Sequence, residues 1–384
     1  MGIGPGAQTP RELAEALRSA AEAGHTIALG GNNSKRRMAG PVPRADEAIA
    51  TTELRRVLQY EPHDLTISVE AGLPWSELSR LLAENRQMVP LDPPFAACAT
   101  VGGVVAANCS GPRRRLYGSA RDLVIGMQFA TLEGKLVDCG GMVVKNVAGL
   151  DMAKLMIGSF GTLAAIAVVN FKLVPMPEQE RTFLLPFETA AKAMAARDRV
   201  LTGVLQPSAI DLLNPVGGGT VGYPGWLLVI RAGGNAAVIQ RYERELGQLG
   251  EILVFDEERQ SGLWRQIEEF SPQFLESHAD GAVVRASCTL KELAGVMESF
   301  RGPSVARAGS GVCYGYFDES RAASSWLTET AARGMKAVME YSREDRDGNG
   351  LWLAPGGDFA IMHRIKQLFD PGNLLNRGRL YGRI

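Results

Sequence analysis

Three glycine-rich segments in the first half of the chain combine residue types that are suited to binding phosphate. The first is Gly30-Gly31-Asn32-Asn33-Ser34, which follows a short apolar stretch. Adjacent glycines let the backbone direct several N–H groups toward one point, and the asparagine and serine side chains add short donors. This pattern predicts an anion site, although a Gly-Gly-Asn-Asn run is equally suited to a simple turn.

The second and third segments repeat this composition. Between Asp92 and Asp122 small residues predominate, which leaves room either for a flat ligand against the backbone or for a tightly packed turn region. The third segment, residues 158–163, places two glycines just before a predicted strand. The basic run 113–115 lies inside the second segment. We predict that it is solvated surface, with a ligand phosphate or a partner subunit as the alternative.

The cysteines exclude several redox centres. They stand at positions 98, 109, 139, 288 and 313 and include no Cys-x-x-Cys pair. This spacing cannot hold a structural zinc ion or an iron–sulfur cluster within the chain, so we expect reduced, mostly buried thiols and no metal site. If the protein transfers electrons, a one-electron relay must come from another chain.

The histidines and three arginines in the second half of the chain do not identify a catalytic residue. A general base needs partners at fixed spacing, and no such partners stand near His25, His63, His278 or His363. Structural roles are therefore predicted, with His278 as the best remaining candidate for a base. Three arginines could bind a substrate carboxylate with two parallel hydrogen bonds, but surface or interface charge is favoured for each: Arg231, Arg285 and Arg307.

The elements that position these residues follow from local signals. Thr9 as N-cap, Pro10 at the first position and Gly24 as a stop predict a helix over 9–23. Apolar patterns predict a further helix over 74–84 and strands over 25–29, 65–70, 124–132, 135–138 and 163–173. From residue 183 to 255 the predicted order is strand, helix, strand, strand, helix, strand, which partly recurs over 282–341.

Length and composition limit the class of protein. The 384 residues favour two domains, and 46% hydrophobic with 22% charged residues is typical of a globular protein. A net charge of −1 provides no general basic field for nucleic acid or an anionic membrane. No apolar run approaches the roughly 20 residues of a membrane span, and no secretory signal is visible. A cytoplasmic protein is expected, reaching the inner membrane only through partners.

Taken together, the three segments resemble the FAD domain of the vanillyl-alcohol-oxidase (PCMH-type) flavoproteins. That pattern is a Gly-Gly-x-x-Ser loop, a Thr-x-Gly-Gly-x-x-x-x-Asn segment and then Gly-x-x-Gly-Thr-Leu, and here its parts begin at Gly30, Thr100 and Gly158. The string 143–149 and the tail 369–378 sharpen the match. They are similar to the FAD-binding subunits of bacterial glycolate oxidase complexes, in the glycolate and D-lactate dehydrogenase branch.

The resemblance implies an α+β fold with a two-part PCMH-type FAD-binding domain and a ferredoxin-like α/β cap. The implied boundaries are 1–177 for the FAD domain, 178–350 for the cap and 351–384 for a segment that returns to the FAD domain. It places the diphosphate against Gly30 to Ser34, and it puts Gly161 and Ile166 near the adenine or ribityl part and Asn376 near the isoalloxazine ring. The residues implied to line the adenosine diphosphate and the near side of the flavin are Thr100, Gly102, Gly103, Asn108, Gly111 and Gly118.

Two departures from the family pattern qualify the function. Relatives that attach flavin covalently carry His or Cys beside the first loop or in the cap, whereas Asn32 and Asn33 stand in this loop, so non-covalent FAD is expected. Catalytic relatives also carry metal-binding histidines at a glycine-rich turn of the cap, and residues 306–311 contain none.

The implied activity is oxidation of a small 2-hydroxy acid, such as glycolate to glyoxylate, by hydride transfer to the flavin. The implied partners are a second flavoprotein and an iron–sulfur subunit that receives the electrons. An FAD-bearing or empty scaffold subunit and a free-standing oxidase remain as alternatives.

Overall fold

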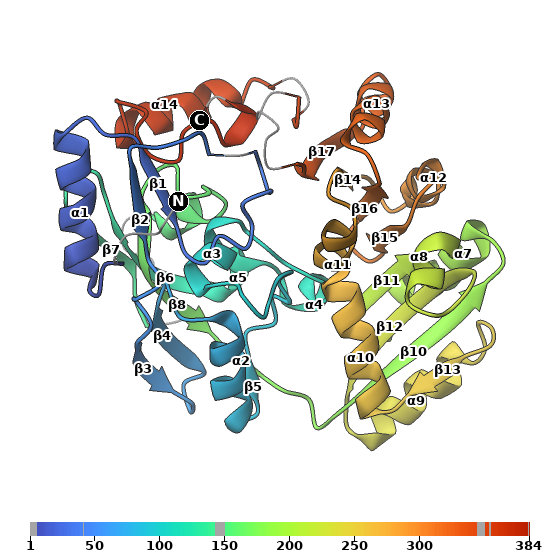
Figure 1. Cartoon of the computed structure of the whole chain (residues 1–384). Helices are drawn as coiled ribbons and strands as arrows, with labels where there is room; N and C mark the ends of the chain where they lie inside the picture. The colour runs from blue at the N-terminus through green and yellow to red at the C-terminus, as the bar shows by residue number, and fades with distance from the viewer. Residues whose placement is uncertain (1–5, 41, 143–149, 344–349, 353–354, 383) are drawn as a thin grey trace. The chain divides into compact units, whose positions relative to one another are not determined.

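The computed structural model describes residues 6–40, 42–142, 150–343, 350–352, 355–382 and 384 (Figure 1). The chain forms two compact units. The first combines Met1–Cys109, Ser119–Met176 and Glu344–Ile384, and the second combines Ser110–Gly118 with Pro177–Arg343. The string 143–149 and most of the polar segment after Arg343 lie outside the described residues.

The first unit is built on an antiparallel sheet. Its order is β3-β4-β8-β6-β7, and two smaller pairs, β1 with β2 and β5 with β9, accompany it. The strands are β1 (Ile27–Gly30), β2 (Glu47–Ala50), β3 (Val57–Glu61), β4 (Thr66–Glu70), β5 (Gln87–Met88), β6 (Val124–Ala130), β7 (Leu136–Gly140), β8 (Ala165–Lys172) and β9 (Val174–Pro175). The helices are α1 (Pro10–Glu22), α2 (Trp75–Glu84), α3 (Val101–Ala106), α5 (Ala120–Leu123), α6 (Ala153–Met156), α14 (Phe359–Phe369) and the 3₁₀ turn η1 (Leu380–Gly382).

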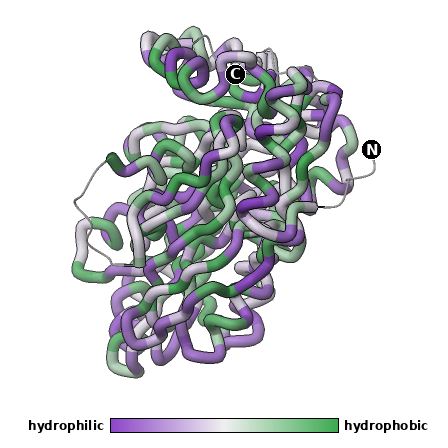
Figure 2. Tube along the Cα trace, turned by 90° about the vertical axis from the view of Figure 1, so that its left-hand side faces the viewer, coloured by the Kyte–Doolittle hydropathy of each residue, from purple (hydrophilic) through white to green (hydrophobic). Residues whose placement is uncertain are grey.

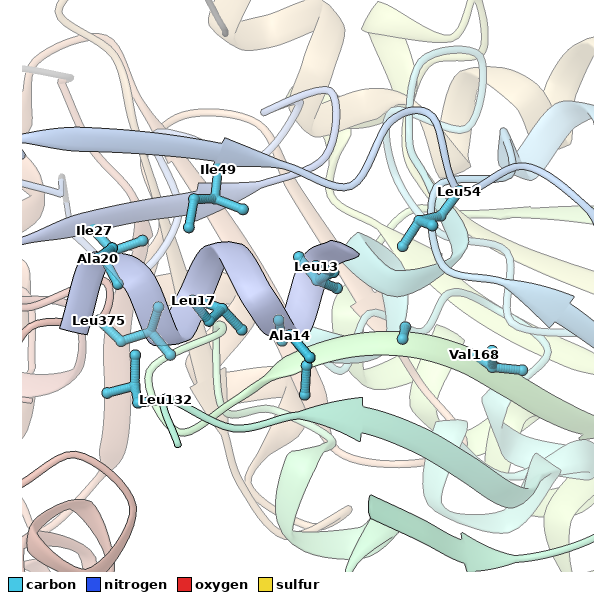
Figure 3. Packing of buried hydrophobic residues seen from close by; sticks show 13 residues of the cluster. Leu13, Ala14, Leu17, Ala20, Ile27, Ile49, Leu54, Leu132, Val168 and Leu375 are labelled. Atoms are coloured by element: carbon cyan, nitrogen blue, oxygen red, sulfur yellow. The ribbon is translucent and has the colours of Figure 1, made fainter. Parts of the chain in front are cut away.

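Helix α1 begins as the sequence predicts. The Thr9 side chain accepts a hydrogen bond from Glu12 N at 3.2 Å, and Pro10 is the first helical residue. Leu13 and Leu17 on one face of the helix are fully buried in a cluster that also contains residues of β1, β2 and β8 (Figure 3). Helix α1 therefore packs against strand β1, and the first glycine-rich loop begins at the end of that strand.

The C-terminal segment returns to strand β1. Ile27 and Leu375 form a parallel bridge, in which Ile27 N donates to Leu374 O at 2.8 Å and Asn376 N donates to Ile27 O at 2.9 Å. Residues near the two ends of the sequence are therefore neighbours in the fold. The C-terminal segment thus belongs to the first unit.

The second unit contains one eight-stranded sheet in the order β13-β10-β12-β11-β15-β16-β14-β17. Its strands are β10 (Gln179–Phe187), β11 (Ala209–Leu213), β12 (Trp226–Gly234), β13 (Leu253–Phe255), β14 (Ala282–Ser287), β15 (Ser304–Arg307), β16 (Val312–Phe317) and β17 (Lys336–Tyr341). Its helices are α4 (Arg114–Tyr117), α7 (Ala190–Thr202), α8 (Pro215–Thr220), α9 (Ala236–Leu246), α10 (Glu257–Glu268), α11 (Phe270–Ser277), α12 (Leu293–Ser299) and α13 (Ser320–Ala331).

This sheet consists of two copies of the same unit. Strands β10 to β13 and strands β14 to β17 each follow the order strand, helix, strand, strand, helix, strand, apart from the added α8. In each half the fourth strand pairs with the first, the first with the third and the third with the second, as in a ferredoxin-like fold. The halves join through antiparallel pairing of β11 with β15. The duplication predicted from the order of elements is therefore present.

One part of the sequence prediction was wrong in detail. The loop-rich region between residues 90 and 118 contains two short helices, α3 and α4. Glycine content suggested loop, but Thr100 caps α3 by accepting a hydrogen bond from Gly103 N at 3.3 Å. A cap and tight packing can hold a helical turn where local propensity is low.

Hydrophobic residues are distributed in short stretches along the chain. In Figure 2 green segments alternate with purple ones along the visible trace. Accordingly, the described helices include none with both the length and the apolar character needed to cross a membrane.

Candidate functional site

A small cavity in the first unit brings the three glycine-rich segments together. Its volume is about 100 Å³, and we call it the glycine-loop cavity. Small-molecule sites usually occupy about 300–1,000 Å³, so this cavity has room for only part of a dinucleotide. It is lined by eleven of the predicted cofactor residues: Gly30, Gly31, Asn32, Asn33, Ser34, Thr100, Gly102, Gly103, Gly161, Ile166 and Asn376.

The first loop needs glycine at both of its leading positions. A Cβ atom on Gly30 would lie 2.3 Å from Asn33 Oδ1, and one on Gly31 would lie 2.4 Å from Thr100 Oγ1. Both distances are shorter than real Cβ contacts, so a side chain at either position would force Asn33 or Thr100 to move. Asn33 has a φ of 52°, a left-handed conformation that asparagine tolerates well. The first loop therefore packs closely against its own Asn33 side chain and against Thr100 at the start of α3.

Helix α3 holds the second segment against the sheet. Gly102 N donates to Ala71 O at 2.7 Å, and a Cβ atom on Gly102 would lie 2.8 Å from the Ala71 methyl group. Gly102 is therefore required by packing, whatever its relation to a ligand.

Asn376 ties the third segment to strand β1. Its Oδ1 accepts a hydrogen bond from Leu29 N at 2.8 Å, while Nδ2 donates to Leu29 O and to Phe160 O, both at 2.9 Å. Both amide hydrogens are thus used within the protein. A Cβ atom on Gly161, where φ is 68°, would lie 2.8 Å from Asn376 Nδ2. Asn376 therefore positions the cavity wall.

A buried ion pair holds Asn376 in place. Lys366 is the buried residue of α14, and its Nζ donates to Asp370 Oδ2 at 2.7 Å, Thr162 O at 2.8 Å and Leu375 O at 3.0 Å. Burial lowers the pKa of Lys366, and the bonds to Asp370 oppose that shift. Asp370 also accepts from Leu374 N and Leu375 N, at 2.9 and 2.8 Å. The pair thus fixes the turn that leads into Asn376.

Three cations that the sequence prediction did not include also line the cavity: Lys35, Arg36 and Arg379. Cationic side chains are therefore available to an anion beside the backbone donors of the first loop. Lys35 directly follows the first loop, which is a local signal that could have been used. Arg379 approaches from the other end of the sequence, and its Nη1 donates to Met38 O at 2.5 Å.

Arg379 has an incompletely satisfied guanidinium group. The residue is partly exposed, but its Nε is buried and has no hydrogen-bond partner among the described residues. Burial lowers the pKa of Arg379 to about 10. None of the described residues that line the cavity is an aspartate or glutamate. The cavity therefore favours an anion, and the diphosphate of a dinucleotide fits its cations, its glycine backbone and its unpaired donor.

Three predicted cofactor residues do not line this cavity: Asn108, Gly111 and Gly118. Asn108 lies just after α3, with a φ of 50° and a buried Oδ1 that has no partner among the described residues. Gly111 and Gly118 belong to the segment that groups with the second unit. The basic run 113–115 makes contacts that hold this segment in the second unit. The sequence had predicted a solvated surface for this run.

Two arginines make those contacts within the second unit. Arg113 Nη2 lies 3.7 Å from Glu180 Oε1, and both side chains are largely buried. Arg115 Nη1 donates to Pro207 O at 3.1 Å, and burial lowers the pKa of Arg115.

The three arginines considered for a substrate carboxylate are each paired with a carboxylate of the chain. Arg231 Nη2 donates to Glu180 Oε2 at 2.7 Å. Arg285 Nε donates to Glu340 Oε1 at 2.9 Å. Arg307 is bonded to the fully buried Asp211 on the neighbouring strand.

The pKa shifts agree with this pairing. Burial would lower the pKa of Arg307, but Asp211, Tyr314 and Tyr316 outweigh burial and raise it. Burial raises the pKa of Glu340 despite the opposing effect of Arg285. The charges of these arginines are therefore compensated by carboxylates of the same eight-stranded sheet and its neighbouring residues.

The histidines do not form a common site. His25 Nδ1 lies 2.6 Å from Glu47 Oε1 on the first unit. His278 stacks on Phe274 with ring centroids 4.2 Å apart, and its Nδ1 lies 2.9 Å from Phe274 O. Its Nε2 lies 3.4 Å from Asp318 Oδ1. Both ring nitrogens of His278 thus have partners within the second unit, and a structural role accounts for them.

Comparison with known families supports the assignment of the cavity to an FAD domain. Residues 6–140 match the family described as FAD binding domain. Residues 353–380 match the family described as FAD linked oxidases, C-terminal domain. The two matches include the first and second glycine-rich segments and the segment that carries Asn376.

Relatives with similar sequences include subunits of glycolate oxidases. The chain is 28% identical over 367 residues to glycolate oxidase subunit GlcE of Escherichia coli (strain K12), which covers 93% of each chain. It is 30% identical over 161 residues to glycolate oxidase subunit GlcD of Bacillus subtilis (strain 168), covering 42% of this chain and 34% of that protein.

Solved structures with similar folds extend over nearly the whole chain. An alkyldihydroxyacetonephosphate synthase matches with a TM-score of 0.73 at 15% identity, covering 96% of this chain and 74% of that one. The 4-ethylphenol oxidase from Gulosibacter chungangensis matches with a TM-score of 0.73 at 11% identity, covering 98% and 88%. At such identities the likeness shows the fold.

Proposed function

Because the chain matches the FAD binding domain and FAD linked oxidase families, we propose that it is an FAD-binding flavoprotein of the vanillyl-alcohol-oxidase (PCMH) type and that the glycine-loop cavity holds the diphosphate of a non-covalently bound FAD. The observation that carries this proposal is the convergence of Gly30 and Gly31 with Arg379, whose Nε lacks a partner among the described residues. When bound, FAD would accept a hydride from the α-carbon of the substrate.

The residues around the cavity have distinct roles in this proposal. Backbone N–H groups of the first loop and the side chains of Lys35 and Arg379 bind the phosphates. Gly161 and Ile166 leave space for the adenine or ribityl part. Asn376 positions the wall through its bonds to Leu29 and Phe160. Attachment is non-covalent in this proposal because no His or Cys stands in the first loop.

For the protein as a whole, we propose an FAD-binding subunit of a glycolate oxidase or dehydrogenase-type complex that oxidises a small 2-hydroxy acid, such as glycolate to glyoxylate. Similarity to GlcE along 93% of both chains supports this proposal. Electrons would leave through an iron–sulfur subunit, and a second flavoprotein subunit would belong to the same assembly.

The paired arginines favour a second candidate function. Arg231, Arg285 and Arg307 each have a carboxylate partner within the chain, so none offers an uncompensated charge to a substrate. A scaffold subunit that carries FAD but lacks substrate turnover of its own would have this property.

The decisive experiment measures the same reaction in two states of the protein. The purified chain and the chain co-expressed with its partner subunits are each supplied with glycolate or D-lactate and an artificial electron acceptor. Full activity only in the co-expressed state supports the complex, and native-level activity of the chain alone would instead establish a free-standing oxidase.

Affinity purification of a tagged copy of the chain from its native cells tests whether the chain works in a complex. Co-purification of a flavoprotein and an iron–sulfur protein is expected. If removal of flavin from this chain alone, through Gly31→Trp, leaves the activity of the assembled complex unchanged, then the chain is a scaffold and the enzyme proposal is wrong.

A further inference from the structure

Two thiols of the second unit lie close together outside the proposed cofactor site. Cys288 directly follows β14 and Cys313 is part of β16, and their Sγ atoms are 4.0 Å apart. Cys288 N donates to Gly311 O at 2.9 Å, which continues the strand pairing one step beyond Ser287 and Val312. Cys313 is fully buried, whereas Cys288 is only partly buried. One thiol can thus react with solutes, while the other reaches only its neighbour.

The two thiols have different tendencies to ionise. The hydrogen bond from Cys313 is the largest influence on Cys288 and lowers its pKa, against the effects of burial and of Glu292. The same bond, together with burial, raises the pKa of Cys313 well above its usual value. Cys288 is therefore the more readily ionised thiol of the pair.

A buried arginine fixes this arrangement. Arg197 Nη2 donates to Leu290 O at 2.9 Å, and Nη1 donates to Ala308 O at 3.1 Å. It thereby links the segment after Cys288 to the turn that precedes Cys313. Its charge also favours the Cys288 thiolate.

The strand register disfavours a disulfide between the two cysteines. Cys313 is paired with Ala286, so Cys288, two residues further along β14, is its diagonal neighbour. Diagonal neighbours across antiparallel strands are about 7–8 Å apart. A disulfide bridges Cα atoms up to about 7 Å apart without backbone movement. The register therefore disfavours a direct Cys288–Cys313 bond and leaves the Cys288 thiol free to react with another partner.

Cys288 lines a cavity with the size and charge of a ligand site. The cavity has a volume of about 760 Å³, which is within the range of small-molecule sites. Three exposed cations line it, namely Lys291, Arg333 and Lys336. The carboxylate of Glu292, also in the lining, already accepts hydrogen bonds from Thr289 N and Oγ1 at 2.9 and 2.8 Å. The charge of the cavity therefore favours an anionic molecule.

We propose that Cys288 is a modification site that forms a mixed disulfide with a small, carboxylate-bearing disulfide such as oxidised glutathione. The Cys288 thiolate attacks one sulfur atom of the disulfide R–S–S–R, and a Cys288–S–S–R bond forms as the original S–S bond breaks. The leaving group departs as the thiolate R–S⁻, which takes up the proton that Cys288 released to solvent. The protein thiol is oxidised and one half of the small disulfide is reduced, so no further oxidant is needed. This inference is independent of the proposed FAD site.

The chain contains its own control for this reaction, because Cys98 in the first unit is an exposed free cysteine. The full chain is incubated with oxidised glutathione, and the modified peptides are quantified by mass spectrometry. Cys288 is expected to gain one glutathionyl group about tenfold faster than Cys98 at neutral pH, because its pKa is lowered and the cations of its cavity attract the anionic reagent. Equal rates at the two sites, or an internal Cys288–Cys313 disulfide without added mass, would overturn the proposal.

Two variants then distinguish the effect of Cys288 ionisation on the reaction rate from the effect of the positive charge of the cavity. Cys313→Ala is expected to slow Cys288 modification several-fold at neutral pH and to move its pH profile upward, with anionic and neutral disulfides alike. The double variant Lys291→Gln, Lys336→Gln is expected to slow the reaction with oxidised glutathione while leaving that with neutral bis(2-hydroxyethyl) disulfide unchanged. A double variant that slows both reagents equally, or neither, would contradict recognition of an anion by this cavity.

Discussion

At the level of single residues, Arg379 brings a positive charge to the glycine-loop cavity, and Met38 O is the partner of its Nη1. Because the Nε of Arg379 is buried and unpaired, we expect its charge to be compensated by the diphosphate when FAD is bound. Arg379→Met should weaken FAD binding about 10- to 100-fold, the loss expected for about 1.5–3 kcal/mol of charge-assisted hydrogen bonding. Titration of the apoprotein, followed by flavin fluorescence, measures this change.

The matched control for this prediction is Arg377→Met. It removes the same charge two residues away, at a partly exposed position that does not line the cavity. An equal loss of affinity in both variants would show that general electrostatics, and not Arg379, determines binding.

Gly31 allows a sharper test of the first loop. In Gly31→Ala the new methyl group would lie 2.4 Å from Thr100 Oγ1, so the loop or the start of α3 must move. We expect FAD affinity to fall at least about tenfold, because backbone donors lose their common direction. Gly141→Ala in the same unit, where nothing lies within 4 Å of the added atom, is the control and should bind normally. Wild-type affinity for Gly31→Ala by the same titration would exclude this loop from the site.

Which site residues the sequence could predict depends on how local their signals are. The first loop and Thr100 are visible because adjacent glycines and an N-cap are signals within a few residues. The approach of Arg379 to Met38 joins positions 341 apart, and a single sequence contains no signal for such a contact. The contacts of the basic run between Gly111 and Gly118 are also distant in sequence, since they are with residues near 180 and 207.

At the level of elements, a buried ion pair and its hydrogen bonds hold α14 in the first unit. Lys366 is its buried residue and contacts Asp370, Thr162 O and Leu375 O. Removing one partner of a buried ion pair leaves an uncompensated charge, which typically costs about 3–5 kcal/mol. Lys366→Met should lower the free energy of unfolding by about that amount, as measured by urea denaturation, and should also release FAD more readily.

An exposed ion pair in the same unit provides the comparison. Arg80 and Glu84 on α2 lie 2.8 Å apart with side chains that are mostly exposed. Arg80→Met should change stability by less than about 1 kcal/mol. A similar, small effect for Lys366→Met would mean that the buried pair does not anchor the C-terminal segment.

Helices and strands, like single site residues, are predictable from the sequence when their signals lie close together along the chain. Helix α1 has its Thr-Pro start and glycine stop within the sixteen positions from Thr9 to Gly24, and its limits were predicted closely. Strand β2 pairs with β1 from seventeen or more residues away and has no alternating pattern of its own, so it was not predicted. Helix α3 was taken for a loop because two of its six residues are glycine, and only packing on Ala71 explains its form.

For the whole molecule, bound FAD should act as a stabilising ligand that can be removed without breaking a covalent bond. Acid precipitation is expected to release all of the flavin, and readdition at about 100 times the dissociation constant should stabilise the apoprotein by roughly 2.7 kcal/mol. Thermal unfolding with and without FAD measures this, with riboflavin as a control because it lacks the diphosphate. Flavin that remains in the washed pellet would refute non-covalent attachment.

The contact between Leu29 and Asn376 also has a consequence during protein synthesis. The two residues are 347 positions apart, and ribosomes add about 5–20 residues per second. The first loop is therefore made roughly 17 to 70 seconds before the side chain that completes its wall. During that interval a nascent chain carries the glycine-rich loops without Asn376 or Arg379. Tight capture of the cofactor is thus expected only after translation has passed the last helix.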